Sequence, residues 1–369
     1  MKRIVIGTLI LIGIVGTLLT LSALKTRKHT APGSAYLFFD ADSILHESYH
    51  GVVDVLSETP VTGSTTFHAF STTKTFTAVG VLQLLEKGWI DLNASVEDYI
   101  PSYKFSHTIS VKDLLAHQSG LLNPIPLKWV HLAINRGFDY SAFADSIVLR
   151  NLKLKRKPGR KFSYSNLNYL VLGRLIEEVS GMAYSEYIQR NVLDKLGSRE
   201  FIGFDLPQKN HARGYYPNSW FQNLLLSLLL DKSRITEDAN EQWRSFKPFY
   251  VDGQAYGGLF ASSKAMMAYC QALFTTEEGL LGESALLQMF NEQLTSEGKG
   301  TGMCLGWFKG SLEGIEYFCH AGGGGGYYSE IRIYPTLKMG SVYMSNASGM
   351  RDLRLLDEFD KKFIKTKDR

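Results

Sequence analysis

A serine and a lysine three residues apart carry the functional groups needed for nucleophilic catalysis. Ser71 and Lys74 open the stretch "STTKTFTAVGVLQLLEKG". A serine hydroxyl is a weak nucleophile until a base accepts its proton, and side chains one helical turn apart share a face. A lysine serves as that base only if burial or nearby cations lower its pKa toward neutrality. The pair predicts an acyl-transfer site, with an N-cap serine on a core helix as the alternative.

The residues after Lys74 predict a buried helix. From Ser71 to Glu86 the chain is apolar on nearly every helical face, and Gly88 follows as a C-cap. A buried lysine costs free energy unless it has a partner or a task, so its place in this helix favours the catalytic interpretation. Two further Ser-x-x-Lys matches are rejected. Ser296/Lys299 lies in a predicted loop with no buried helix behind it, and Ser22/Lys25 falls at the edge of an apolar N-terminal segment that is predicted to cross a membrane.

Tyr164 and Asn166 form a second polar element, "YSN", just before a predicted helix that ends near Gly181. A tyrosine near Lys74 can relay a proton, and an asparagine can hold a substrate amide. A turn with a packing aromatic is the alternative. A similar "YPN" at Tyr216–Asn218 shows that the triplet alone is not specific.

The third element is the stretch "HAGGGGGYYSEIRIY", which begins with His320 at the predicted end of a strand. Five glycines allow a substrate to approach the backbone closely, with a flexible hairpin loop as the alternative. The glycines do not predict a dinucleotide-binding loop, because a strand rather than a helix follows them.

These three elements, in this order, resemble the motif set of serine β-lactamases and penicillin-binding proteins. The chain is most similar to the class C β-lactamase-related family, with its D-alanyl-D-alanine carboxypeptidases and esterases. The resemblance covers most of Asp42 to Asn346 and leaves out the N-terminus and the region Leu206–Gln254. It includes the segments "ISVKDLLAHQSGL", "PGRKFSYSNLNYLVLGRLIEEVSG" and "GGLFASSKAMMAYCQALF".

The resemblance implies a serine hydrolase that forms an acyl-enzyme on a D-amino-acid peptide, a β-lactam or an ester. Lys74 and Tyr164 would activate Ser71, and the oxyanion would rest on the backbone amides of Ser71 and Gly323. The substrate-binding residues would be Asn166, His320, Gly322 and Gly323. No metal or organic cofactor is implied, and the nine histidines contain no HExxH or comparable ligand spacing.

The third element departs from the β-lactamase pattern. β-Lactamases carry a lysine there, which helps to hold the substrate carboxylate, whereas a histidine such as His320 is mostly neutral at pH 7. A D-alanyl peptidase or an esterase is therefore favoured over an efficient β-lactamase, with a non-catalytic or single-turnover penicillin-binding or sensor module as the alternative. "KMG" at Lys338–Gly340 falls past a strand end and is no substitute. His117, in "LLAHQSG", is expected to be structural.

Length and composition fit one large globular domain. The chain has 369 residues, 44% of them hydrophobic and 21% charged, which is ordinary for a protein that buries a sizeable core. Strand-like runs at both chain ends predict an α/β (α+β) fold: a β-lactamase-like antiparallel sheet from the two ends, flanked by helices, plus a helical lobe. We expect a catalytic domain at 34–369, with the α/β lobe at about 34–70 and 290–369 and the helical lobe at about 71–289.

The N-terminal segment predicts a membrane anchor. Residues 4–24 form an apolar run of about 21 residues, which is long enough to cross a bilayer as a helix. We interpret 1–28 as an uncleaved signal anchor, with a cleaved signal peptide as the alternative. The catalytic domain is then expected outside the cytoplasm, in a bacterial periplasm or cell envelope. The first 28 residues carry five cations, and removing them from the net charge of +4 leaves −1, so nucleic-acid binding is not indicated.

Two features remain open at the level of sequence. Cys304 and Cys319 flank a predicted hairpin that turns near Ser311–Gly314, and two small buried side chains are favoured over a disulfide. The region Leu206–Gln254 contains an apolar block, "WFQNLLLSLLLDK". We interpret the block as a packed helix of the helical lobe, with a lid over an acyl pocket or a membrane-surface contact as alternatives.

Overall fold

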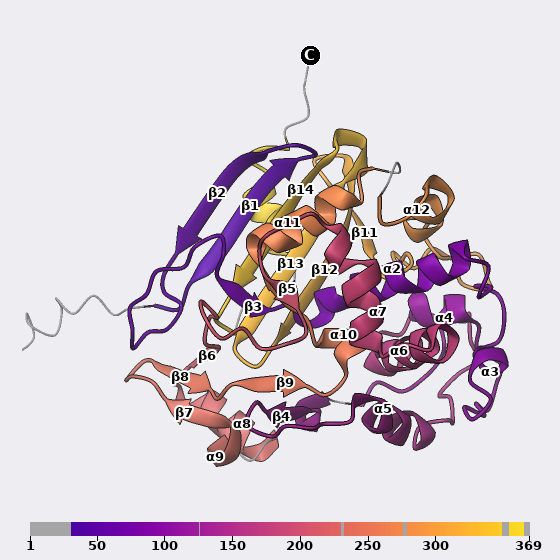
Figure 1. Ribbon diagram of the computed structural model, residues 1–369, viewed down its shortest axis with the longest axis horizontal. Coiled ribbons are helices and arrows are strands. Elements are labelled where there is room, and N and C mark those ends of the chain that lie inside the picture. The colour runs from indigo at the N-terminus through magenta and orange to yellow at the C-terminus, as the bar shows by residue number, and fades with distance from the viewer. Residues whose placement is uncertain (1–30, 125, 230–231, 276–278, 349–353, 365–369) are drawn as a thin grey trace, which may run out of the picture. The chain divides into compact units, whose positions relative to one another are not determined.

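A six-stranded antiparallel sheet brings the two ends of the described chain together (Figure 1). The computed structural model describes residues 31–124, 126–229, 232–275, 279–348 and 354–364. Across the sheet the strands are β11 (Phe308–Leu312), β12 (Ile315–Gly324), β13 (Tyr327–Tyr334), β14 (Met339–Ser345), β1 (Ser34–Asp40) and β2 (Ile44–His50). Because β1 pairs with β14 along its whole length, the predicted sheet built from both chain ends is confirmed.

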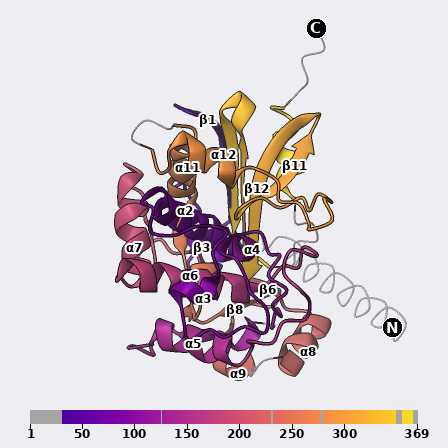
Figure 2. The ribbon, with the colours of Figure 1, turned by 90° about the vertical axis from the view of Figure 1, so that its right-hand side faces the viewer.

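Nearly all helices of the described residues lie between β2 and β11 in the sequence. The central helix is α2 (Thr73–Glu86), which follows the 3-10 turn η1 (Phe70–Thr72) and is buried on nearly every side. The other helices are α3 (Val96–Tyr99), α4 (Val111–Leu115), α5 (Tyr140–Leu149), α6 (Asn166–Ser180), α7 (Tyr184–Asn191), α8 (Trp220–Leu229), α9 (Lys232–Ile235), α10 (Gln254–Gly257), α11 (Ser263–Ala272), α12 (Glu283–Met289) and α13 (Leu356–Asp360). Figure 2 shows α6 and α7 beside α2, and both contact it.

Short strands and turns complete the fold. Three small antiparallel sheets are present among the described residues: β3 (Thr66–His68) with β10 (Phe260–Ser262) and β5 (Ile202–Gly203); β4 (Val130–Leu132) with β9 (Phe249–Val251); and β6 (Tyr215–Pro217) with β8 (Trp243–Phe246) and β7 (Thr236–Asp238). The remaining 3-10 turns are η2 (Pro126–Lys128), η3 (Leu193–Lys195) and η4 (Pro335–Leu337).

Both faces of the large sheet are covered. In β1 the side chains of Ala35, Leu37 and Phe39 join the main core, on the face that α11 contacts. Tyr36 and Phe38 point to the opposite face and join a second apolar cluster with residues of α13. Each large side chain buried in this way contributes roughly 1.5–3 kcal/mol relative to an exposed one. Alternating apolar contacts therefore fix the register of β1 between its neighbours.

Local signals set one end of each of two helices, and the end of α6 at Gly181 confirms the prediction. Ser110 accepts a hydrogen bond from the backbone of Asp113, whose carboxylate accepts one in return, and this capping box starts α4. Gly181 ends α6 in the left-handed conformation, with φ at 70°, which glycine adopts without steric cost.

The prediction that His320 ends a strand is wrong. His320 lies inside β12, which continues through Gly322, Gly323 and Gly324. These glycines pair with residues of β13 in regular antiparallel register. Pairing with a buried neighbouring strand thus overrides the low strand preference of glycine.

The cysteines are not paired. Cys304 precedes β11, and Cys319 in β12 lies opposite Phe308, so the two do not face each other across the hairpin. All three cysteines, Cys270 included, are free and buried. The structure therefore agrees with the favoured interpretation, two small buried side chains.

The region Leu206–Gln254 contains α8, α9 and the sheet of β6, β8 and β7. α8 leaves Trp220 77% and Leu224 49% exposed, so this helix is not packed on all sides.

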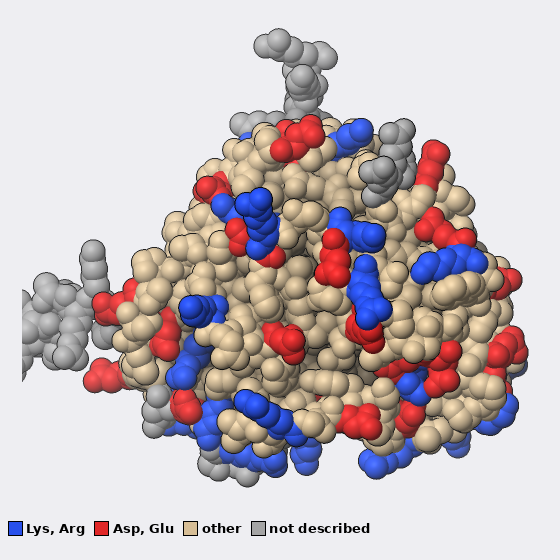
Figure 3. Space-filling model, viewed as in Figure 1, with Lys and Arg blue, Asp and Glu red and all other residues tan. Residues whose placement is uncertain are grey.

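Figure 3 shows basic and acidic side chains interspersed over most of one face of the molecule, with basic ones gathered along its lower edge.

Two predictions concern the N-terminus, whose residues 4–24 lie outside the described residues. The chain divides into the units Met1–Ala31 and Pro32–Arg369. In the described part of the chain, no helix is both long and apolar enough to cross a membrane. The membrane anchor and the domain boundaries therefore stay predictions.

A buried network of charged side chains and hydroxyl groups links α13 to the large sheet. Arg332 of β13 is fully buried, and its guanidinium lies 3.1 Å from Glu330 and 2.7 Å from Asp357. The Asp360 carboxylate accepts hydrogen bonds from three hydroxyl groups, those of Tyr36, Tyr334 and Ser341. Removing one member of such a network leaves the others buried without partners.

We expect Asp360→Ala to destabilise the protein by about 3–5 kcal/mol. Three hydroxyl groups lose their acceptor, and the Arg332 guanidinium, 3.9 Å away, loses one of its ion-pair partners. Urea unfolding followed by circular dichroism measures this change. Glu358→Ala is the matched control, since Glu358 belongs to the same helix but is exposed. Equal losses in the two variants would show that the network does not hold α13 in place.

Candidate active site

Ser71 lies in η1, immediately before α2, and its side chain is half-buried. Neither η1 nor α2 has a side-chain N-cap hydrogen bond, so Ser71 is not the capping serine of the alternative interpretation. Its Oγ lies 3.1 Å from Nζ of Lys74. The predicted pair of hydroxyl and amine is thus in hydrogen-bonding contact.

Lys74 is fully buried and has no ion pair among the described residues. Its Nζ donates a hydrogen bond to the backbone carbonyl of Tyr256 at 2.9 Å. The centroids of three aromatic rings, those of Tyr164, Tyr169 and Tyr256, lie 5.1, 5.5 and 5.2 Å from Nζ. Burial lowers the pKa of Lys74 well below its ordinary value, so the neutral amine that a base requires is favoured.

Tyr164 stands beside this pair. Burial raises the pKa of Tyr164 to about 12, while a hydrogen bond with Ser71 opposes the rise. Its hydroxyl therefore keeps its proton at neutral pH. The structure brings Ser71, Lys74 and Tyr164 together, as the motif order predicts.

Asn166 is the first residue of α6 and is 7% exposed. Its backbone amide donates to Oδ1 of Asn123, and its own Oδ1 is buried without a partner among the described residues. A buried amide oxygen without a partner is costly, so it is suited to accept a hydrogen bond from a ligand.

His320 is 1% exposed, and its ring lies 6.4 Å from that of Tyr164. Nδ1 lies 2.9 Å from the carbonyl oxygen of Ala321, to which it must donate, so the neutral ring carries its free lone pair on Nε2. Nε2 is buried and has no partner among the described residues. Burial, and secondarily the charge of Lys74, lowers the pKa of His320 to about 3. The ring is therefore neutral at physiological pH.

The glycines of β12 lie against η1, the turn that contains Ser71. A Cβ atom on Gly322 would lie 2.6 Å from the amide nitrogen of Ser71 and would overlap the carbonyl oxygen of Ala69. Only glycine allows β12 to approach η1 this closely. Gly323, the next residue, is exposed, and its amide is the predicted second donor to an oxyanion.

The backbone before Ser71 is strained. Phe70 has φ at 46°, a left-handed conformation that is unfavourable for a bulky side chain. Such strain persists where the surrounding structure enforces it, and it is common next to reactive groups. Here it turns the chain sharply between β3 and α2.

Two contributors to the site were not predicted. The Tyr256 carbonyl that accepts from Lys74 belongs to the backbone and has no sequence signature. His117 was expected to be structural, yet its ring lies 4.4 Å from that of Tyr164. The sequence could have indicated this position only if the segments "LLAHQSG" and "YSN" had been known to lie side by side in the fold. Within the described residues, no three His, Cys, Asp or Glu side chains converge as a metal site.

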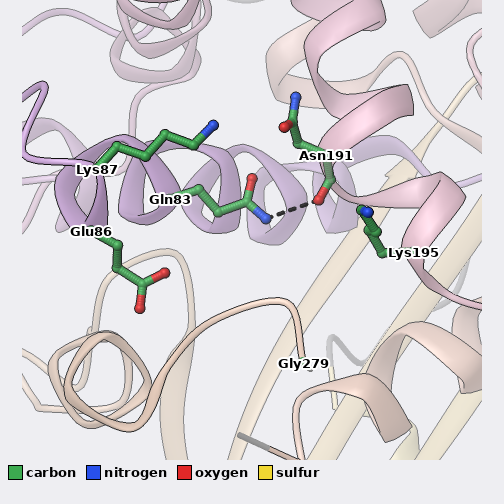
Figure 4. Close-up of a pocket in the computed structure, with 6 residues that line it drawn as sticks. All are labelled: Gln83, Glu86, Lys87, Asn191, Lys195 and Gly279. Atoms are coloured by element: carbon green, nitrogen blue, oxygen red, sulfur yellow. Dashed lines mark hydrogen bonds between the residues drawn. The ribbon is translucent and has the colours of Figure 1, made fainter. Parts of the chain in front are cut away.

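A separate pocket of about 640 Å³ lies toward the other end of α2 (Figure 4). Its lining residues are Gln83, Glu86, Lys87, Asn191, Lys195 and Gly279. Gln83 follows Lys74 by nine positions, or about 14 Å along the helix axis. The side-chain amide of Gln83 bonds to the Asn191 carbonyl at 2.9 Å. The pocket contains none of the predicted catalytic groups.

Comparison with known protein families assigns this chain to one of them. The family model described as Beta-lactamase matches residues 20–362. The chain therefore belongs to the Beta-lactamase family.

Two curated relatives illustrate the range of similarity. Penicillin-binding protein 4* of Bacillus subtilis (strain 168) is 23% identical over 333 residues, which cover 86% of this chain and 69% of that protein. Protein flp of Staphylococcus aureus (strain MW2) is 29% identical over 196 residues, 51% of this chain. The matched part spans only 39% of the length of Protein flp.

Solved structures share the fold. The octameric penicillin-binding protein homologue from Pyrococcus abyssi aligns with a TM-score of 0.69 at 24% identity, over 91% of this chain and 74% of its own. FmtA from Staphylococcus aureus aligns with a TM-score of 0.69 at 20% identity, over 93% of this chain and 88% of its own. D-amino acid amidase from Ochrobactrum anthropi SV3, complexed with D-phenylalanine, aligns with a TM-score of 0.69 at 19% identity, over 88% of this chain and 89% of its own.

We expect Gly322→Ala to lower both the thermal midpoint and the reactivity of Ser71, because the added methyl group would displace the backbone of η1. Differential scanning fluorimetry and labelling by a fluorophosphonate probe measure the two effects. Gly203→Ala is the control, since its Cβ would meet neighbouring atoms no closer than 3.6 Å. Unchanged labelling of folded Gly322→Ala would contradict a tight contact at the nucleophile.

Proposed function

We propose that this protein is a serine hydrolase that cleaves an amide or ester through an acyl-enzyme on Ser71. The observation that carries the proposal is the contact between Ser71 and a fully buried Lys74 that has no ion pair among the described residues. Membership of the Beta-lactamase family supports the same chemistry.

The proposed first step is attack of Ser71 Oγ on the substrate carbonyl carbon. Neutral Lys74 accepts the hydroxyl proton as the new C–O bond forms, and the carbonyl electron pair moves to the oxygen. The amides of Ser71 and Gly323 stabilise this oxyanion. Tyr164 donates its proton to the leaving group as the bond to it breaks and regains a proton from Lys74. Water then releases the acyl group by the reverse sequence of proton transfers.

The proposed substrates are D-amino-acid peptides or esters. Efficient hydrolysis of β-lactams is not expected. His320 presents a neutral nitrogen acceptor where a lysine would present a cation, which weakens the binding of a free carboxylate. Solved structures with this fold include a D-amino acid amidase complexed with D-phenylalanine and a D-stereospecific amidohydrolase from Streptomyces. A penicillin-binding or sensor module that is acylated once is the alternative outcome.

We further propose that residues 4–24 anchor the protein in a membrane with the catalytic domain outside the cytoplasm. The apolar run in the sequence supports this proposal. Fractionation of cells before and after alkaline carbonate extraction tests it, and release of the protein into the soluble fraction would contradict it.

Ser71→Ala is expected to abolish acylation and turnover, because among the described residues no other hydroxyl is hydrogen-bonded to Lys74. Intact mass spectrometry after mixing with a penicillin, together with an assay of drug loss and of D-alanyl peptide and ester hydrolysis, checks this. Ser296→Ala is the matched control, since it alters a second Ser-x-x-Lys sequence in an exposed loop. Hydrolysis retained in Ser71→Ala would refute the proposed function.

The rate of ester hydrolysis is expected to reach its plateau well below pH 10.5. Because burial lowers the pKa of Lys74, the neutral base is present at lower pH, and activity is lost only as the pH falls through this lowered pKa. A profile of kcat/KM from pH 5 to 10, corrected with Ser71→Ala, measures the ascending limb. A limb centred near 10.5, the ordinary lysine value, would argue against Lys74 as the base.

A further inference from the structure

His117 adopts an unusual backbone conformation next to the site. Six non-glycine residues in the described part of the chain have positive φ. Four of them are exposed turn residues: Glu58, Asn210, Glu313 and Lys338. The other two are Phe70, which precedes the nucleophile, and His117, which is fully buried with φ at 55°. Buried strain of this kind persists only where the surrounding structure enforces it, and it marks functional sites.

His117 holds the backbone on both sides of Tyr164. Its carbonyl oxygen accepts a hydrogen bond from the amide of Ser163 at 2.7 Å. Its ring Nδ1 accepts one from the amide of Ser165 at 3.2 Å. The two rings lie 4.4 Å apart at a tilt of 37°. One residue therefore fixes the backbone before Tyr164, the backbone after it and the face of its ring.

The hydrogen bonds also determine the tautomer of His117. A backbone amide can only donate, so Nδ1 is an acceptor without a proton. The amide group of Asn168 donates to the same nitrogen at 2.9 Å, and Oδ1 of Asn168 accepts from Ser119 at 2.6 Å. Protonation of Nδ1 would set a third donor against these two. Burial, and then the charges of Lys74 and His320, lowers the pKa of His117 well below its ordinary value, which agrees with this geometry.

We propose that His117 is a positioning residue that keeps the hydroxyl of Tyr164 at hydrogen-bonding distance from Ser71. It acts through its Nδ1 and its carbonyl oxygen and does not touch the substrate. This role rests on the proposed function, because it matters only if Tyr164 transfers a proton. A histidine needed merely to fill the core would not require an acceptor at the δ position.

Two substitutions separate these possibilities. Asparagine places Oδ1 where histidine has Nδ1 and tolerates positive φ, so His117→Asn keeps the acceptor. Glutamine at the same position places its amide one bond further out, so His117→Gln loses it. Hydrogen exchange of the peptide that covers 163–165 should be at least about tenfold faster in His117→Gln and close to wild type in His117→Asn, because only the former frees the Ser165 amide.

Acylation by an activated ester should follow the same order. We expect a loss of about 100-fold in His117→Gln, since small displacements of a catalytic group cost about this much, and less than tenfold in His117→Asn. A loss in His117→Asn as large as in His117→Gln would overturn the proposal, as would unchanged exchange at 163–165 in folded His117→Gln.

A double-mutant cycle distinguishes positioning from general structural damage. In a Tyr164→Phe background the phenolic hydroxyl is absent, so His117→Gln should lower the acylation rate by less than about twofold further. Equal fold-losses in the two backgrounds would overturn the proposal. If the wild-type protein forms no acyl-enzyme, the proposed function fails and the role of His117 in the reaction fails with it. Hydrogen exchange alone then reports whether His117 holds the segment.

Discussion

The site depends on a lysine, Lys74, that is buried without an anionic partner among the residues that the structure describes. Burying a cation in this way is costly unless its charge is lost. Lys74 is the second residue of α2, which is buried on nearly every side. Within the described part of the chain, its amine lies against a hydroxyl, a backbone carbonyl and three aromatic rings. The fold thus favours the neutral amine before any substrate arrives. The hydrophobic core that stabilises α2 therefore also lowers the pKa of the amine that we propose as the base.

A second constraint joins the helix to the large sheet. β12 lies so close to η1 that Gly322 has no space for a side chain. The hydroxyl of Ser329, on β13, donates to the carbonyl of Ala69 and fixes the same turn from the neighbouring strand. Ser71, the proposed nucleophile, therefore lies where a strand from the C-terminal part of the chain meets a helix from its first quarter. Catalytic geometry at this junction depends on the sheet that both chain ends build.

Much of this arrangement could be predicted from local sequence. The apolar residues after Lys74 predict burial directly, and the strand-like runs at both chain ends predict the sheet to which β1 belongs. What could not be predicted depends on tertiary contacts. The strand through Gly322 is set by pairing with β13, which local preference opposes. His117 acts on Ser165, a partner 48 positions away, and the Tyr256 carbonyl belongs to the backbone, which every residue has.

The histidine of the third element changes the electrostatics of the whole site. A lysine at this position would place a second cation near Lys74 and would lower its pKa by repulsion. His320 is neutral, since its Nδ1 donates to the Ala321 carbonyl and burial disfavours its charged form. Burial is therefore the cause that lowers the pKa of Lys74 here. A site of this kind depends on exclusion of water from α2, so substitutions that loosen the core around Lys74 should reduce reactivity even where they leave Ser71 in place.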